Sequence, residues 1–228
     1  MPFQIALDGP VGAGKGTVSR LVSERLELLY VDTGAMYRST VVLAQREGID
    51  IHDETALVTA LKKCTIEMRN PLDDEKDGRL TTVILDGEDI SWKIRTEEVS
   101  RQVSVVAAHG RVREELVRKQ QEIARTQEVI MEGRDIALRV LPDATFKIFL
   151  TADPIIRAKR RHLELQTRGQ DVTYNQVYQD LLKRDEYDST RKIDPLQILP
   201  EHLVVDTSDL TVEQAVDLIV TQAKLLKS

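Results

Sequence analysis

The chain has 228 residues, of which 41% are hydrophobic and 31% charged, as is usual for a soluble globular protein. This length is enough for one sizeable α/β core that carries inserted subdomains. The net charge of −6 argues against general binding to DNA or RNA. No apolar stretch approaches the roughly 18 residues of a membrane span, and the single cysteine, Cys64, excludes an internal disulfide. With no secretion signal in view, we expect a cytoplasmic protein.

The first stretch with a clear chemical signature covers residues 3–17. An apolar run that ends at Asp8 predicts a strand, and a glycine-rich turn and a helical pattern follow it. Glycines leave the backbone N–H groups free to surround phosphate oxygens, and a helix N-terminus attracts the same anion. Lys15 supplies a charge for the β- and γ-phosphates, which predicts a P-loop for ATP. Its predicted ATP-binding residues are Gly9, Pro10, Val11, Gly12, Ala13, Gly14, Lys15, Gly16 and Thr17.

The residue after the P-loop lysine narrows the class of protein. The general pattern places Ser or Thr there as a magnesium ligand, whereas this chain has Gly16 and then Thr17. We expect Mg²⁺ to accompany ATP, with Thr17 bound to it directly or through water. This form of the loop resembles nucleoside monophosphate kinases more than GTPases.

A second buried strand is predicted at residues 28–31, and the loop Asp32–Arg38 follows it. In a parallel α/β sheet, loops at strand C-termini line the ligand crevice. Arg38, at the start of the next helix, is therefore a candidate for holding a substrate phosphate. Taken alone, the stretch also fits a turn with a helix N-cap.

Residues 53–96 depart from the α/β alternation. A helix at 54–62 precedes strand patterns at 65–69 and 80–85, and Asp86–Gly87 is a hairpin turn signal. We interpret the region as a small antiparallel sheet inserted into the parallel architecture. Helical patterns then begin at Thr96 and after Gly110.

Three more parallel strands are predicted at 128–132, 145–150 and 202–206. Arg134 and Asp135 directly follow the first of them, at the ligand edge of the sheet. A salt-bridged turn is the alternative interpretation. The last helix is predicted to begin with a capping box made by Thr211 and Gln214.

Two groups of arginines follow the fourth strand. Arg157, Arg160 and Arg161 have helical spacing, and an interruption at 168–170 indicates a hinge. A short hairpin of helices here would be a lid that excludes water from phosphoryl transfer. Further on, the spacing predicts that Arg184, Asp188 and Arg191 share one helix face. Solvated surface ion pairs are the alternative for both groups.

Together these stretches resemble the bacterial-type cytidylate kinases over nearly the whole chain. The motifs that carry the resemblance are Gly9–Thr17, Asp32–Arg38, Gly87–Ile90, Ile94–Thr96, Gly133–Asp135, Pro142–Asp143, Arg157 with Arg160–Arg161, Arg184–Asp185, Asp188–Ser189 and Arg191. The resemblance implies an α/β P-loop three-layer fold with a five-stranded parallel sheet. It also implies a small antiparallel-sheet domain that binds the monophosphate and a short helical lid. We expect the core at 1–34, 112–154 and 172–228, the insert at 35–111 and the lid at 155–171.

The resemblance implies ATP-dependent phosphorylation of CMP and dCMP, by a monomer that binds neither nucleic acid nor membranes. The implied catalytic residues are Lys15, Arg134, Arg157, Arg161 and Arg191, and the implied lid residues are Arg157, Arg160 and Arg161. The implied CMP-binding residues are Thr33, Arg38, Ser104, Arg113, Arg134, Asp135, Arg184, Asp188 and Arg191. Among these, the resemblance assigns the phosphate to Arg38, Arg134 and Arg191, and the ribose to Asp188 with Arg184. Ser104, Arg113 and Asp135 would read the base.

The sequence departs from the family pattern at two places. Ala137 and Leu138 stand where a glycine and a threonine are usual, and Thr33 stands where serine is common. Neither change removes a charged group that the mechanism needs. Two competing hypotheses are a kinase for UMP or AMP and a nucleotide-binding switch without turnover. Two separate sets of phosphate-binding arginines argue against the switch, which needs only the set for the donor.

Overall fold

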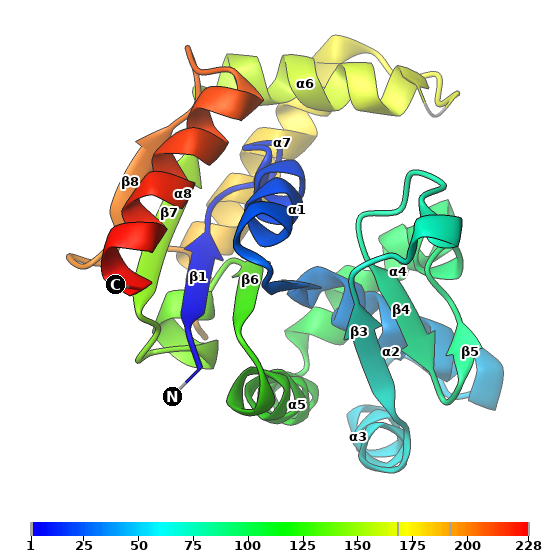
Figure 1. Cartoon of the computed structure of the whole chain (residues 1–228). Coiled ribbons are helices and arrows are strands. Elements are labelled where there is room, and N and C mark those ends of the chain that lie inside the picture. The colour runs from blue at the N-terminus through cyan, green and yellow to red at the C-terminus, as the bar shows by residue number, and fades with distance from the viewer. Residues whose placement is uncertain (1, 168, 192, 228) are drawn as a thin grey trace. The chain divides into compact units, whose positions relative to one another are not determined.

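The computed structural model describes residues 2–167, 169–191 and 193–227. The chain divides into two compact units, both drawn in Figure 1. We call Leu28–Met131, with the first two residues, unit 1, and Phe3–Glu27 together with Glu132–Ser228 unit 2.

The strands, in chain order, are β1 (Gln4–Asp8), β2 (Leu29–Asp32), β3 (Ile66–Arg69), β4 (Thr82–Leu85), β5 (Glu88–Asp89), β6 (Val129–Gly133), β7 (Phe146–Thr151) and β8 (Leu203–Asp206). The helices are α1 (Lys15–Leu26), α2 (Thr33–Glu47), α3 (Glu54–Lys63), α4 (Glu97–Ala108), α5 (Gly110–Thr126), α6 (Pro154–Thr167), α7 (Tyr174–Thr190) and α8 (Val212–Lys227). Short helical turns lie at Asp73–Glu75, Lys93–Arg95 and Ile136–Val140.

The larger sheet has five parallel strands in the order β2-β6-β1-β7-β8, which confirms the predicted α/β class. β7 pairs with β1 on one side and with β8 on the other, with Ile5 opposite Phe146 and Thr151 opposite Asp206. Its strands are nearly continuous apolar runs because parallel sheets are covered on both faces. Ile5, Leu7 and Ile148 are completely buried.

In unit 2, helix α1 packs against α8, and α6 packs against α7 (Figure 1). The predicted capping box at the start of α8 is confirmed: the Gln214 N–H donates to Thr211 Oγ1, and the Thr211 N–H donates to Gln214 Oε1. Thr173 and Gln176 make a second capping box at the start of α7. Each box satisfies backbone donors that the first turn of a helix leaves free.

In unit 1, β3, β4 and β5 form the small antiparallel sheet that the sequence predicts (Figure 1). Asp86 and Gly87 have φ values of 50° and 84°, and they make the predicted tight turn between β4 and β5. Helix α2 packs against α4, and α3 packs against α5. The predicted start of α4 is also confirmed, because the Thr96 hydroxyl accepts from the Val99 N–H.

One detail differs from the sequence predictions. Helix α7 ends at Thr190, and Arg191 has an extended ψ of 142°, so Arg191 does not share a helix face with Arg184 and Asp188. Helix α6 continues to Thr167, and the predicted hinge residue Arg168 lies outside the described residues. The predicted domain boundaries stay a prediction. Within the described ranges, no helix is both long enough and apolar enough to cross a membrane.

Candidate active site

The glycine-rich loop connects the end of β1 to the start of α1, as the sequence predicts. Gly14 is the N-cap of α1 and has a left-handed φ of 88°. Gly9 has a φ of 153°, and a Cβ atom there would lie 2.0 Å from the carbonyl oxygen of Leu150. The neighbouring strand β7 therefore demands glycine at position 9, in addition to any need for space around a phosphate.

Lys15 is only 8% exposed, and its Nζ donates a hydrogen bond to the carbonyl oxygen of Pro10, 2.8 Å away. Burial, and next the charge of Arg134, lower the pKa of Lys15 to about 7. The carboxylates of Glu132, Asp8 and Asp188 oppose this shift. A phosphate that binds next to this buried amine would favour its charged form and so raise its pKa again.

A cavity of about 310 Å³ opens beside the loop. Thr17 is exposed on the first turn of α1 and lines this cavity together with Gly12 and Gly14. Arg160 and Arg161 on α6 also line it. Apolar side chains contribute as well, namely Leu210 and, on α8, Val212 and Ala215.

The three arginines of α6 have different partners. Arg157 is buried and donates to both oxygens of Asp185, at 3.1 and 2.6 Å, and to the carbonyl oxygen of Val11 in the loop, at 3.0 Å. Arg160 donates to the hydroxyl and the carbonyl oxygen of Thr207. Arg161 pairs with Glu164 on the helix surface, as the alternative interpretation expects. The three side chains therefore do not act as one exposed set.

The segment after β6 makes two ion pairs with the end of α7. Arg134 Nε donates to Asp188 Oδ2 at 2.8 Å, and Arg191 Nη2 lies 3.3 Å from Asp135 Oδ1. Arg184 lies 3.5 Å from the other oxygen of Asp188, which is buried. Five predicted CMP-binding residues thus lie in one cluster, and the salt-bridged turn that was the alternative interpretation is also present.

Asp8 belongs to this cluster, although the sequence interpretation gave it no role. It is the last residue of β1, and its carboxylate accepts from the Ile136 N–H at 2.7 Å and from the Ala137 N–H at 2.9 Å. The turn at Ile136–Val140 therefore forms with Ala137 and Leu138 in place of the usual glycine and threonine. A buried aspartate directly before the glycine-rich loop was the only sequence signal for this contact.

In unit 1, Asp32 is the N-cap of α2 and accepts from the Ala35 N–H at 3.0 Å. Arg95 donates to its other oxygen at 2.9 Å. Burial opposes ionisation of Asp32, yet Arg95, Arg38 and the Ala35 N–H hold the pKa of this carboxyl below its ordinary value. The N-cap interpretation is thus confirmed, and the same aspartate fixes the helix that carries Thr33 and Arg38.

The predicted base-reading residues are divided between the units. Ser104 is exposed on α4, and Arg113 is buried on α5 with its guanidinium 5.8 Å from the centre of the Tyr37 ring. Asp135 belongs to unit 2. Their common role in base recognition stays a prediction.

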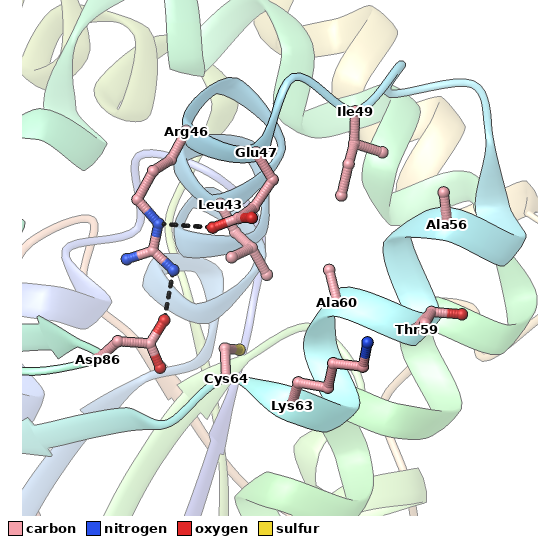
Figure 2. A pocket seen from close by; sticks show the side chains of 10 residues that line it. All are labelled: Leu43, Arg46, Glu47, Ile49, Ala56, Thr59, Ala60, Lys63, Cys64 and Asp86. Carbon is pink, nitrogen blue, oxygen red and sulfur yellow. Dashed lines mark hydrogen bonds and ion pairs between the residues drawn. The ribbon is translucent and has the colours of Figure 1, made fainter.

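A second cavity, of about 470 Å³, lies in unit 1 between α2, α3 and the turn after β4 (Figure 2). It contains none of the predicted site residues. Arg46 on its wall pairs with Glu47 and Asp86, so the charge of Arg46 is compensated. Cys64, which also lines it, is 7% exposed, and burial raises the pKa of its thiol. The thiol is therefore poorly placed to act as a nucleophile.

Comparisons with known proteins identify the family of this chain. The sequence model of the family described as cytidylate kinase matches residues 5–225. Curated cytidylate kinases from Shouchella clausii and Caldanaerobacter subterraneus are 46% and 45% identical to this chain. The alignments cover 97% and 95% of this chain and 96% and 92% of those relatives.

Solved structures show the same fold at much lower sequence identity. A shikimate kinase from Bacteroides thetaiotaomicron has a TM-score of 0.50 at 13% identity, with 99% of each chain covered. An uncharacterised protein from Eubacterium ventriosum has a TM-score of 0.52 at 11% identity, with 97% of this chain and 98% of that chain covered. The sequence matches over nearly the whole chain, with the loop and the arginine cluster in place, show that the chain belongs to the cytidylate kinase family.

Proposed function

We propose that this chain transfers the γ-phosphoryl group of ATP to CMP and dCMP and so makes ADP with CDP or dCDP. The observation that carries the proposal is the family match over residues 5–225. The buried Lys15 in the glycine-rich loop supports it, because this loop is the part that phosphoryl transfer from ATP requires.

The donor nucleotide binds along the loop and the adjoining cavity. Backbone N–H groups of the loop and Lys15 hold the β- and γ-phosphates. The apolar side chains of Leu210, Val212 and Ala215 suit the flat base, and Arg160 and Arg161 line the same cavity. The α6 arginines cover the polyphosphate when the lid closes and keep water away from it.

The acceptor phosphate binds to Arg134 and Arg191, with Arg38 as a third ligand. In the free protein, Asp188 and Asp135 hold the first two guanidinium groups at 2.8 and 3.3 Å. A phosphate carries more charge than either carboxylate and accepts two N–H bonds from one guanidinium, so it competes well for these groups. Asp188 and Arg184 then bind the ribose.

The chemistry needs no covalent intermediate on the protein. An oxygen of the CMP phosphate forms a bond to the γ-phosphorus while the bond from that phosphorus to the β,γ-bridging oxygen breaks, and ADP leaves with the electron pair. The acceptor is already largely ionised at neutral pH, so no general base is assigned. Lys15, Arg134, Arg157, Arg161 and Arg191 neutralise the charge that spreads over the transferred group.

Mg²⁺ fits the donor end of the site. The Thr17 hydroxyl is exposed at the loop, and hard oxygen donors of this kind, with phosphate oxygens, are the ligands that Mg²⁺ prefers. Thr17 would hold the ion directly or through water. When bound, the metal would neutralise phosphate charge at the β- and γ-oxygens.

The base contacts explain a preference for cytosine. Cytosine offers an amino donor at N4 and acceptors at N3 and O2, which complement the carboxylate of Asp135 and the donors of Arg113 and Ser104. Uracil reverses the pattern at N3 and at position 4. A buried polar group left unpaired costs about 1–3 kcal/mol, so UMP is discriminated against.

We also propose that the protein is a monomer and that it is cytoplasmic.

Initial rates of ADP formation with CMP, dCMP, UMP and AMP, measured in parallel with ATP and Mg²⁺, test the proposal. We expect turnover confined to the cytosine nucleotides. Turnover with UMP or AMP instead would keep the kinase and contradict the base-reading assignment. No turnover with any of the four would favour a nucleotide-binding module.

A further inference from the structure

Asp8 is a buried carboxylate that links the strand before the glycine-rich loop to the segment that carries Arg134 and Asp135. It is 2% exposed, and its two oxygens each accept one backbone N–H, from Ile136 and from Ala137. These donors are themselves 1% and 2% exposed. Two short bonds to adjacent N–H groups fix both the position and the orientation of the turn that follows Asp135.

The surroundings of Asp8 support a role for its charge as well as its shape. The Leu199 N–H donates to Nδ1 of His202, so the proton of the neutral imidazole is on Nε2. This Nε2 is buried, lies 3.7 Å from Asp8 Oδ2 and has no hydrogen-bond partner among the described residues. The separation is too long for a hydrogen bond, but it places a buried polar N–H group beside the carboxylate.

We propose that Asp8 is a positioning residue for phosphoryl transfer, which holds the Ile136–Ala137 turn and thereby places the Arg134 guanidinium for the transferred phosphoryl group. The inference rests on the proposed function, in which Arg134 contacts that group. Asp8 itself contacts backbone N–H groups, so it acts through Arg134. A displacement of about 1 Å at a reacting group can cost on the order of 10²-fold in rate.

The test is Asp8→Asn, which keeps the size of the side chain. An asparagine has one acceptor oxygen, so its amide N–H₂ must face the N–H of Ile136 or Ala137. We expect kcat to fall by about 10²-fold, while the affinity for a non-hydrolysable ATP analogue changes by less than about 3-fold. Binding is measured at pH 6, below the Lys15 pKa of about 7, so that loss of the Asp8 charge, which helps to raise that pKa, disturbs ATP binding less than it would at higher pH. Asp53→Asn is the matched control, because Asp53 also accepts a backbone N–H, that of Ala56, but outside the site.

A double-mutant cycle with Arg134→Ala separates positioning from general damage. If Asp8 acts through Arg134, Asp8→Asn costs no further activity in the Arg134→Ala background. Equal losses in both backgrounds, or an ATP affinity that falls as much as kcat, would overturn the inference and leave the proposed function in place. A normal rate for Arg134→Ala would remove Arg134 from the reaction and overturn the inference, whereas absence of turnover in the unchanged protein would overturn the proposed function.

A second variant keeps the test decisive if Asp8→Asn does not fold. Replacing Ala137 by lactic acid turns its N–H into an ester oxygen, which deletes one donor to Asp8 and leaves every side chain in place. We expect this change to lower kcat without weakening ATP binding. The Ile136 amide resonance, followed by NMR, should remain that of an N–H bound to a carboxylate. An unchanged kcat would contradict the inference.

Discussion

The two units hold the arginines of the proposed site in different ways. In unit 2, Arg134 and Arg191 each pair with a carboxylate, at 2.8 and 3.3 Å. In unit 1, Arg113 is buried and lies over the Tyr37 ring, while α2, which carries Arg38, is fixed through its Asp32 N-cap. A phosphate can replace a carboxylate at a guanidinium, whereas burial and the contact with the Tyr37 ring hold the Arg113 guanidinium in place when a ligand binds. We infer that unit 2 is built for exchange of anions and unit 1 for fixed recognition of the acceptor.

The largest expected effect concerns Lys15 of unit 2, whose Nζ donates to the carbonyl oxygen of Pro10. Lys15→Gln removes the charge and keeps a side chain that can still reach the Pro10 carbonyl oxygen. We expect kcat/KM to fall by about 10²–10³-fold, as for the loss of a preorganised electrostatic group. Steady-state rates with ATP and CMP measure it. Lys183→Gln, on the exposed surface of α7, is the control, and a comparable loss there would remove the special role of Lys15.

The second prediction compares a buried ion pair with a surface pair on the same helix. Arg157→Met leaves Asp185 without its bidentate partner, and we expect the free energy of unfolding to fall by about 3 kcal/mol. Arg161→Met removes the surface pair with Glu164 and should cost less than about 1 kcal/mol. Denaturant unfolding of the two variants gives the difference. Equal small losses would show that Arg157 is free to leave Asp185 at little cost.

The third prediction tests the fixed recognition in unit 1. Arg113→Met keeps much of the buried volume and removes the donors for the cytosine acceptors. We expect the ratio of kcat/KM for CMP to that for UMP to fall by about 10-fold, because one buried hydrogen bond accounts for roughly that discrimination. Arg125→Ala, exposed at the end of α5, should leave the ratio unchanged. An unchanged ratio for Arg113→Met would place base recognition elsewhere.

The smallest expected effect is the number of protons that the protein takes up when ATP binds. The pKa of Lys15 is lowered to about 7, so this amine is mostly neutral in the free protein at pH 8. Polyphosphate favours the charged form, so ATP binding at pH 8 should be accompanied by uptake of less than one proton, and at pH 6 by almost none from Lys15. Calorimetry in buffers of different ionisation enthalpy measures the uptake, and Lys15→Gln should abolish it. Equal uptake in that variant would assign the proton to another group.

Local chemistry made much of the fold predictable. The glycine-rich loop, the Asp86–Gly87 turn and the capping residues Thr96 and Thr211 each act on neighbours within a few residues, so one sequence contains the whole signal. Arg134 was likewise chosen as a site candidate from a local signal: it directly follows a predicted strand, and loops at strand ends line the ligand site in such sheets.

The contacts that could not be predicted join residues far apart in the chain. Asp8 binds backbone N–H groups 128 and 129 residues away, and every non-proline residue has such a group, so nothing marks the partner. The end of α7 was missed for a different reason. Arg191 leaves the helix and donates to the Asp194 carbonyl oxygen, where Asp194 has a left-handed φ of 49°. The sequence there is polar and contains no stop signal before Pro195.

The most direct test of the exchange of anions in unit 2 is a comparison of CMP and cytidine binding by calorimetry, for the unchanged protein and for Arg191→Ala. We predict that the unchanged protein binds CMP about 10²-fold more tightly than cytidine. The reason is that charge-assisted hydrogen bonds to a phosphate each contribute roughly 1.5–3 kcal/mol. In Arg191→Ala the preference should shrink by about 10-fold while cytidine binds as before. An equal preference for CMP in both proteins would contradict the account.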